Sequence, residues 1–216
     1  MIVYLIRHGE SEGNVGPFVQ GPEESLTADG IKQAQLLGKR FQSISADVIL
    51  SSPEERAKKT AEIIGKYTNI PIELSDLLVE FIKPSVIIKK LKKDPKVKEI
   101  KKLLKDNFHV SGWKHSDEEN FEDFKKRAVA LLNYLLTRKE QNIVIATHGI
   151  FMRMLIAVVI IGDELTSYEY WKFFVALYLD NTGITVLKSN DKELYDDAPK
   201  WELVTWNDHA HLGEVE

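Results

Sequence analysis

The sequence predicts an α/β fold, in which a mainly parallel central sheet lies between two helical layers as a three-layer α/β/α sandwich. Three observations support this prediction. Short apolar, β-branched runs recur along the chain, amphipathic helical patterns separate them, and the runs are apolar at consecutive positions. Such runs are typical of parallel strands with both faces covered. No internal repeat, low-complexity tract or Ser/Gly linker interrupts the chain, so we expect residues 1–216 to form a single domain.

The predicted strands lie at four places. They are Ile2–Ile6, Asp47–Leu50, Ile143–Ala146 and Phe174–Leu179. In the first half of the chain, Thr27 caps a helix whose apolar residues share one face: Ile31, Ala34, Gly38 and Phe41. The stretch Ser52-Pro53-Glu54-Glu55 has the form of a capping box with Pro at the first helical position, and it predicts a helix through Ile64.

Two further helices and a hairpin are predicted in the second half. An amphipathic helix is indicated by apolar residues at a spacing of three to four: Phe121, Phe124, Ala128, Leu131 and Leu135. Gly149–Ile161 is apolar nearly all round and, being shorter than the ~20 residues that cross a bilayer, predicts a buried helix. Asn181-Thr182-Gly183 resembles a hairpin turn between Phe174–Asp180 and Ile184–Lys188, and Trp201–Trp206 predicts a last strand.

Composition excludes several classes of function. The chain has 29 Lys+Arg against 33 Asp+Glu, a net charge of −4, which argues against a nucleic-acid-binding protein. With no cysteine, disulfides, Cys-ligated zinc and a cysteine nucleophile are excluded. Met1 leads directly into an apolar strand without a preceding basic stretch, so we expect no secretory leader, a cytoplasmic location and no membrane partner. The sequence leaves open whether the protein forms a homodimer.

One segment departs from the average charge. Lys83–Lys105 holds ten lysines against Asp94 and Glu99, a local charge of +8 that leaves −12 for the rest of the chain. Its apolar spacing predicts two short basic amphipathic helices with a break at Asp94-Pro95. We expect a lid-like insertion at about residues 82–115. Its lysines either draw anionic substrate toward the site or form a solvated helical face.

Two of the predicted strands end in a His-Gly pair. Arg7-His8-Gly9 follows the first strand and Thr147-His148-Gly149 follows the third. The carboxyl ends of parallel strands meet at one edge of a sheet, and Gly lets a ligand approach the backbone. We therefore expect both imidazoles at one site, although a single histidine of this kind would be better explained as a structural side chain.

A third strand-to-helix junction, Ser51–Arg56, adds an arginine. Helix N-termini attract anions, and a guanidinium matches the geometry of phosphate. Taken alone, Arg56 would be better explained by pairing with nearby carboxylates. Three junctions that together supply Arg7, His8, Arg56 and His148 predict a phosphate pocket.

Five ordered blocks of the chain resemble the motifs of the histidine phosphatase superfamily, also called phosphoglycerate mutase-like. LIRHGESEGN, from Leu5 to Asn14, is similar to the nucleophile motif of that family. The other blocks are SLTADGIKQA (residues 25–34), SSPEERAKKTAEII (51–64), NFEDFKKR (120–127) and ATHGIFMR (146–153). The resemblance covers the whole chain and implies a phosphoglycerate mutase-like fold.

The resemblance implies a covalent mechanism on a small phosphorylated metabolite. His8 would attack the phosphoryl group to form a phosphohistidine, which water then hydrolyses. Arg7, Arg56 and His148 would hold the phosphoryl oxygens, and Asn14 would add a neutral hydrogen bond. The two arginines would also lower the pKa of His8 and keep it neutral. No metal or other cofactor is expected.

Three further residues are assigned to the substrate pocket, and a carboxylate to the leaving group. The pocket residues are Gln20, Gly21 and Gly149. The family takes the leaving-group proton from an acid after the third strand region, and Glu80 matches best, with Asp76 as the alternative. The apolar neighbours of Glu80 favour a protonated carboxyl suited to a general acid.

The chain also departs from the family pattern in ways that favour hydrolysis. The Gly-x-Trp-Glu-Gly sequence that often follows the acid is replaced by Phe81-Ile82-Lys83-Pro84-Ser85, and the longer Trp-containing stretch of phosphoglycerate mutases is absent. We therefore expect a metal-independent phosphomonoester hydrolase of the histidine acid phosphatase type. A cofactor-dependent phosphoglycerate mutase-type isomerase and a non-catalytic phospholigand-binding protein are the alternatives.

The other four histidines are candidates for contacts with a metal or with a substrate. His209-x-His211 resembles a metal-binding pair, but it has neither cysteine nor a clear third ligand nearby. His109 and His115 flank Trp113 in the predicted lid, where they either touch the organic part of a substrate or simply pack.

Overall fold

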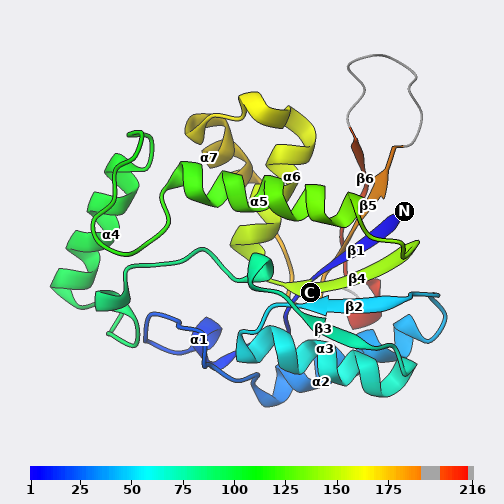
Figure 1. Ribbon diagram of the computed structural model, residues 1–216. Coiled ribbons are helices and arrows are strands. Elements are labelled where there is room, and N and C mark those ends of the chain that lie inside the picture. The colour runs from blue at the N-terminus through cyan, green and yellow to red at the C-terminus, as the bar shows by residue number, and fades with distance from the viewer. Residues whose placement is uncertain (191–199, 214–216) are drawn as a thin grey trace.

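A six-stranded sheet with helices on both faces forms the centre of the molecule (Figure 1). The computed structural model describes residues 1–190 and 200–213. The strands are β1 (Ile2–Arg7), β2 (Val48–Ser51), β3 (Ile72–Leu74), β4 (Asn142–Thr147), β5 (Ile184–Ser189) and β6 (Trp201–Asp208). The helices are α1 (Glu12–Val15), α2 (Ala28–Phe41), α3 (Glu55–Thr68), α4 (Pro95–Asn107), α5 (Phe121–Leu136), α6 (Gly149–Ile161) and α7 (Ser167–Ala176).

The sheet is parallel over four of its strands. Its order is β3-β2-β4-β1-β5-β6, in which β3, β2, β4 and β1 run in one direction. At one edge, β5 pairs antiparallel with β1, and β6 pairs antiparallel with β5. Because β1 and β4 are parallel neighbours, with Arg7 opposite Thr147, the residues that follow them leave the sheet side by side.

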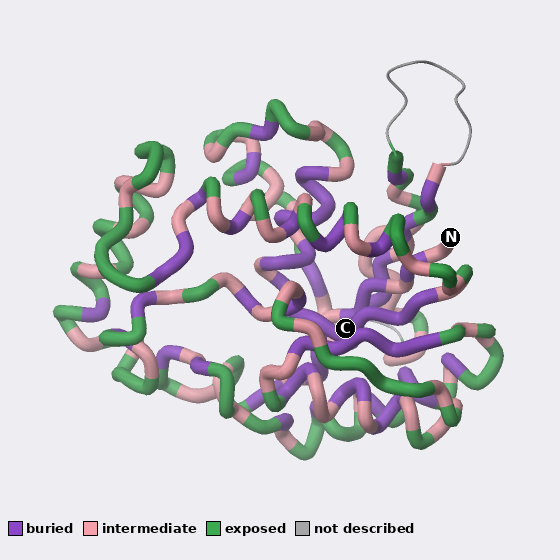
Figure 2. Tube along the Cα trace, in the orientation of Figure 1, coloured by how far each residue is buried: buried purple, intermediate pink, exposed green. Residues whose placement is uncertain are grey.

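Alternate residues of the central strands pack into two separate hydrophobic cores. Val3 and Ile143 belong to the core formed with α5 and α6, whereas Ile6 and Val144 belong to the core formed with α2 and α3. These strands are buried along most of their length in Figure 2. The predicted three-layer α/β/α sandwich with a mainly parallel sheet is therefore confirmed.

Most predicted elements are present near their expected ends. The Thr27 hydroxyl accepts a hydrogen bond from Gly30 N at 3.0 Å and caps α2 as predicted. The capping box at Ser52 is wrong, because α3 begins at Glu55 with Glu54 as its N-cap. The Ser52 hydroxyl instead accepts the Glu54 N–H and contacts His148, so it belongs to the site.

The strand and hairpin predicted around Phe174 are wrong. Residues 167–176 form α7, which starts at a reciprocal capping box between Thr166 and Glu169. Asn181-Thr182-Gly183 does not connect two strands of a hairpin but lies against the end of β1, where Thr182 N donates to Arg7 O at 2.9 Å. The short, exposed β3 was not predicted from the sequence.

The basic segment contains one helix rather than two. Residues 85–87 form only a 3₁₀ turn, and the Asp94 carboxylate accepts the Lys96 N–H, so Asp94-Pro95 starts α4. Val97 of α4 packs on Val19 and Ile87. Backbone hydrogen bonds between Val19 and residues 89 and 90 tie this segment to the loop that follows α1.

No helix in the described part of the chain is long and apolar enough to cross a membrane. Helix α6 is buried against the sheet, as predicted.

Candidate active site

His8 lies buried at the carboxyl end of β1, with its ring oriented by two partners. Its Nδ1 is 2.7 Å from the Gly9 carbonyl oxygen, which can only accept a hydrogen bond, so the proton is assigned to Nδ1. Its Nε2 therefore carries the lone pair and accepts a hydrogen bond from Arg56 Nε at 3.2 Å. Burial, followed by the charges of Arg56 and Arg7, lowers the pKa of His8 well below 6.5. The imidazole is neutral, as a nucleophile requires.

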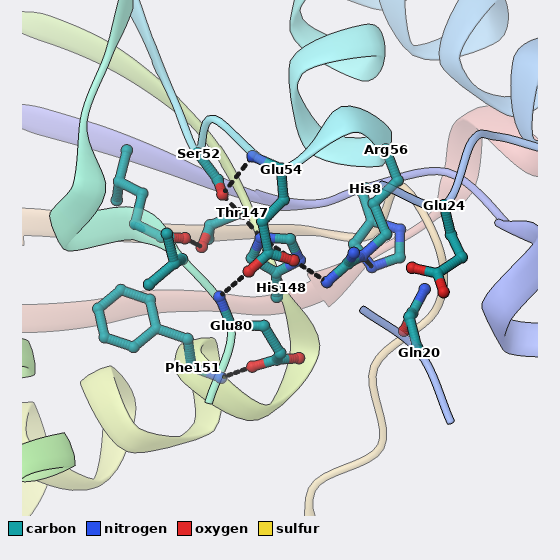
Figure 3. A network of polar contacts seen from close by, with 12 residues as sticks. His8, Gln20, Glu24, Ser52, Glu54, Arg56, Glu80, Thr147, His148 and Phe151 are labelled. Carbon is teal, nitrogen blue, oxygen red and sulfur yellow. Dashed lines mark hydrogen bonds and ion pairs between the residues drawn. The ribbon is translucent and has the colours of Figure 1, made fainter. Parts of the chain in front are cut away.

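Arg56 is buried in the first turn of α3 and its guanidinium is held on three sides (Figure 3). Besides His8, it donates to the Gly21 carbonyl at 2.8 Å and pairs with the Glu54 carboxylate. Burial raises the pKa of Glu54, although the nearby guanidinium opposes this effect. The sequence motifs do not indicate that Glu54 is a site residue.

His148 faces His8 across the edge of the sheet, with the ring centroids 5.2 Å apart. Its Nε2 lies 2.9 Å from Ser52 Oγ and 3.7 Å from the Glu54 carboxylate. Burial, with Arg56 the next cause, lowers the pKa of His148 well below 6.5. Its Nδ1 is buried and has no hydrogen-bond partner among the residues described. An unsatisfied buried nitrogen is costly, which suggests that a ligand completes it.

The Glu80 carboxylate lies at the N-terminus of α6. It accepts hydrogen bonds from Ile150 N at 3.2 Å, from Phe151 N at 3.0 Å and from Phe81 N at 2.9 Å. The apolar surroundings expected for this carboxyl from its neighbours in sequence are therefore wrong, because polar backbone donors surround it. The Glu80 N–H donates to Glu54 at 2.9 Å, which connects the two carboxylates in one network (Figure 3). Asp76, the alternative, is exposed.

Arg127 of α5 fixes the loop that carries Glu80. Its guanidinium donates to the carbonyl oxygens of Leu77, Val79 and Glu80. It also makes a two-pronged ion pair with Glu119, with both N–O distances at 2.7 Å. Since both partners are nearly buried, this pair holds the loop in a defined position.

Arg7 and Asn14 approach the same edge of the sheet. The Arg7 side chain passes over Gly149, where a Cβ would lie 3.3 Å from two of its atoms. Gly149 therefore makes room for this arginine. Asn14 Oδ1 accepts hydrogen bonds from the Ser11 N–H and hydroxyl, both at 3.0 Å, which leaves its amide nitrogen as the donor for a ligand.

The loop after α1 brings Gln20 and Gly21 beside Arg56. The Gly21 carbonyl accepts from Arg56, and the Gln20 amide donates to Ser11 Oγ at 2.7 Å. Close backbone packing supports the His8 loop, since a Cβ on Gly9 would lie only 2.5 Å from the Gly30 carbonyl oxygen. All the predicted site residues except Asp76 thus gather at this edge.

Two other contributions could not be anticipated from the motifs. Asn181 donates to the His8 carbonyl at 2.9 Å and so supports the nucleophile loop. Lys83 is largely buried, and burial lowers its pKa although the Glu80 charge opposes this shift. The basic segment therefore contributes a cation to the electrostatics of Glu80, Arg56 and Glu54.

The remaining histidines lie elsewhere. His209 Nδ1 is 2.9 Å from Asn207 O, and His211 Nε2 is 3.0 Å from Thr182 Oγ1. Within residues 1–190 and 200–213, no cluster of three or more His, Asp or Glu side chains is arranged to hold a metal ion. His109 lines an apolar cavity beside the site, whereas His115 is exposed.

Comparisons with known proteins identify the family of this chain. The family model for the histidine phosphatase superfamily (branch 1) matches residues 3–209. "Putative phosphoserine phosphatase 2" of Hydrogenobacter thermophilus is 30% identical over 216 residues, covering 99% of this chain and 98% of the relative. "Probable phosphoglycerate mutase GpmB" of Proteus mirabilis is 30% identical over 226 residues, covering 99% and 95%.

A solved structure supports the fold. The alpha-ribazole phosphatase from Shigella flexneri superposes with a TM-score of 0.80 at 24% identity, covering 97% of each chain.

Proposed function

Because the chain belongs to the histidine phosphatase superfamily, branch 1, we propose that it hydrolyses small phosphomonoesters through a phosphohistidine intermediate on His8. The observation that carries this proposal is the state of His8. Its Nδ1 is bonded to the Gly9 carbonyl, its Nε2 bears the lone pair beside Arg56, and its pKa is depressed. Such an imidazole is a nucleophile at neutral pH.

In the first step, His8 Nε2 gives up its hydrogen bond from Arg56 Nε and forms a bond to phosphorus, while the bond from phosphorus to the alcohol oxygen breaks. Arg7, Arg56, Asn14 and His148 stabilise the charge on the phosphoryl oxygens. The three sides of Arg56 are bonded to His8, Gly21 and Glu54, so a phosphoryl oxygen replaces at least one of these contacts. The unpartnered Nδ1 of His148 supplies a further donor when Ser52 Oγ donates to its Nε2.

The leaving alkoxide takes a proton from Glu80. The resulting carboxylate then accepts a proton from the water that attacks phosphohistidine, which releases phosphate and restores neutral His8. The two arginines and the His148 imidazole supply the charge stabilisation that metal ions supply in other phosphoryl-transfer enzymes, so we propose that the reaction needs no metal. This is the histidine acid phosphatase type of chemistry.

A mutase is the second candidate, favoured by the similarity to the probable phosphoglycerate mutase of Proteus mirabilis. It uses the same phosphohistidine but returns the phosphoryl group to another hydroxyl of the substrate. The missing Trp-containing stretch and the altered sequence around Glu80 favour hydrolysis.

The test compares wild type and His8→Ala with an aryl phosphate and a panel of phosphorylated metabolites. Wild type should release phosphate, be unaffected by chelators, and form an acid-labile, base-stable phosphoenzyme. His8→Ala should lose both turnover and labelling, whereas the exposed control His115→Ala should keep both. Positional transfer without phosphate release would identify a mutase. Binding of a phosphate analogue without turnover or labelling would identify a non-catalytic protein.

A further inference from the structure

A large aromatic cavity opens beside the candidate proton donor. Its volume is about 670 Å³, within the usual range of small-molecule pockets. Its walls come from the end of α4 and the residues after it, from α7, and from the start of α5 and α6. The residues that carry the argument are Phe81, Phe108, Phe124, Ile150, Trp171 and Phe174.

The cavity and the Glu80 carboxylate share two residues. Phe81 and Ile150 line the cavity with their side chains, while their backbone N–H groups donate to Glu80. The Arg153 guanidinium lies 5.5 Å from the Phe174 ring and donates to the Gly149 carbonyl. It therefore connects the cavity wall to Gly149, over which the Arg7 side chain passes. A leaving group protonated by Glu80 would therefore have this cavity within reach.

The walls are chemically suited to an apolar group. The Phe81 ring packs edge-on against Phe124 at 5.0 Å and against Phe108 at 6.2 Å. On the other side, Trp171 stacks on Phe174 at 5.4 Å. The lining residues Lys105 and His109 are exposed, so their basic side chains lie at the solvent side, whereas the buried lining residues Phe124 and Tyr170 carry no charge. A charged leaving group, such as that of phosphoserine, would find few partners inside.

We propose that this cavity binds the organic part of the substrate, and that this part is an extended apolar or aromatic group. The inference rests on the proposed phosphatase activity and narrows its substrate class. Burial of apolar surface of the leaving group supplies binding energy, while the phosphate is positioned between His8 and His148.

The test uses a series of primary alkyl phosphates: ethyl, butyl and hexyl phosphate. These leaving groups have nearly the same basicity, so differences in rate report on binding rather than on the chemistry of the alkoxide. We expect kcat/KM to rise by about fourfold for each methylene that enters the cavity. Hexyl phosphate should also exceed phosphoserine. A flat or falling series would overturn the inference.

A matched pair of variants tests whether the dependence of kcat/KM on chain length comes from the cavity wall formed by α7. Trp171 lines the cavity and Val175, on the same helix, does not. Both side chains are partly exposed, so neither replacement by alanine should unfold the protein. Trp171→Ala should lower the ratio of hexyl to ethyl kcat/KM by about tenfold, and Val175→Ala should leave it as in wild type. A flat series combined with a change in oligomeric state in Trp171→Ala would identify a contact between copies instead.

Binding of alkylphosphonates separates this inference from the proposed activity. These analogues cannot release an alcohol, so calorimetric titration of wild type measures the affinity of the cavity for the alkyl group without turnover. Hexylphosphonate should bind more tightly than ethylphosphonate by the same factor per methylene. If alkyl phosphates are hydrolysed but neither series depends on chain length, the activity stands and the cavity inference is wrong. If nothing is hydrolysed but hexylphosphonate binds more tightly, the activity fails and the cavity stands as a ligand site.

Discussion

At the residue scale, one carbonyl oxygen decides which nitrogen of His8 reacts. Gly9 O can only accept a hydrogen bond, so it holds the proton on Nδ1 and leaves Nε2 with its lone pair. The nucleophile and the residue that orients it are adjacent in sequence. The geometry of this pair is therefore independent of distant loops, although its burial depends on them.

Glu54 is the residue whose role follows least from the sequence. Its carboxylate pairs with Arg56 and lies near His148, the two groups proposed to receive a phosphoryl oxygen. A carboxylate there competes with substrate for the same positive charge. Because burial raises the pKa of Glu54, this competition should weaken as the pH falls.

We predict that Glu54→Gln lowers KM for a phosphomonoester by about tenfold at pH 8, roughly 1.4 kcal/mol. The difference between variant and wild type should narrow from pH 8 to pH 5, because burial raises the pKa of Glu54 and so favours its protonation as the pH falls. Steady-state kinetics at both pH values measure this, with the exposed neighbour Glu55→Gln as the control. An unchanged or raised KM in Glu54→Gln would show that the carboxylate positions Arg56 rather than competing with substrate.

At the scale of elements, local capping explains why the strand predicted at residues 174–179 is wrong. The apolar run at 174–179 has strand-like composition, but Thr166 and Glu169 cap a helix ahead of it. Of the residues in α7, only Tyr170 is fully buried, so the helix packs through a narrow face. The apolar residues alone did not indicate that the capping box at Thr166 and Glu169 starts a helix that continues into this run.

Helix α4 carries the basic charge on an exposed surface. Lys93, Lys96, Lys98 and Lys101 are all exposed, and only Val97 of the helix is buried. Lys92 donates to the carbonyl oxygens of Gly13 and Gly16, which fixes this charge beside the loop that contains Asn14. A cationic surface next to the site should accelerate the encounter with dianionic substrates.

Replacing Lys93, Lys96, Lys98 and Lys101 by glutamine should lower kcat/KM by about threefold at low ionic strength. The difference should vanish near ~0.5 M salt, where surface charges are screened over a few ångströms. The control replaces four exposed lysines elsewhere: Lys32, Lys39, Lys66 and Lys139. Equal effects in the two quadruple variants would mean that α4 is simply a solvated face.

At the scale of the whole molecule, the two site histidines link folding to pH. The pKa values of His8 and His148 are both depressed in the native protein, while in the unfolded chain they are near 6.5. Between the native and unfolded values, the unfolded state binds more protons. The stability contribution is therefore fully present above pH 6.5 and is lost as the pH falls toward the native values.

From pH 6.5 to pH 5.0 the free energy of unfolding should fall, because the unfolded chain takes up protons on both imidazoles before the native protein does. Urea denaturation across this range measures the loss. A His8→Asn/His148→Asn double variant should show a smaller loss than wild type, whereas the exposed pair His109→Asn/His115→Asn should match wild type. Identical pH dependence in all three proteins would refute the assignment to the site histidines.

The sequence predicted the sheet, its covered faces and most of the site for a physical reason. Arg7 ends β1, His8 and His148 directly follow β1 and β4, and Arg56 lies in the first turn of α3 after β2, while parallel neighbours place these strand ends at one edge. The contacts of Glu54, Lys83 and Asn181 depend on how loops distant in sequence pack, which periodicity does not encode. The same holds for the aromatic cavity, which forms only when α4 and α7 lie across from each other.

The place of β1 in the sheet has a consequence for the order of folding. Ile2 pairs with Asn142 on one side and with Lys188 on the other, so neither neighbour of β1 exists until much of the chain has been synthesised. Such distant pairings are slow to form, and an unpaired apolar strand is prone to aggregate meanwhile. The sheet around His8 at the end of β1 is therefore complete only after β4 and β5, far along the chain, have paired with β1.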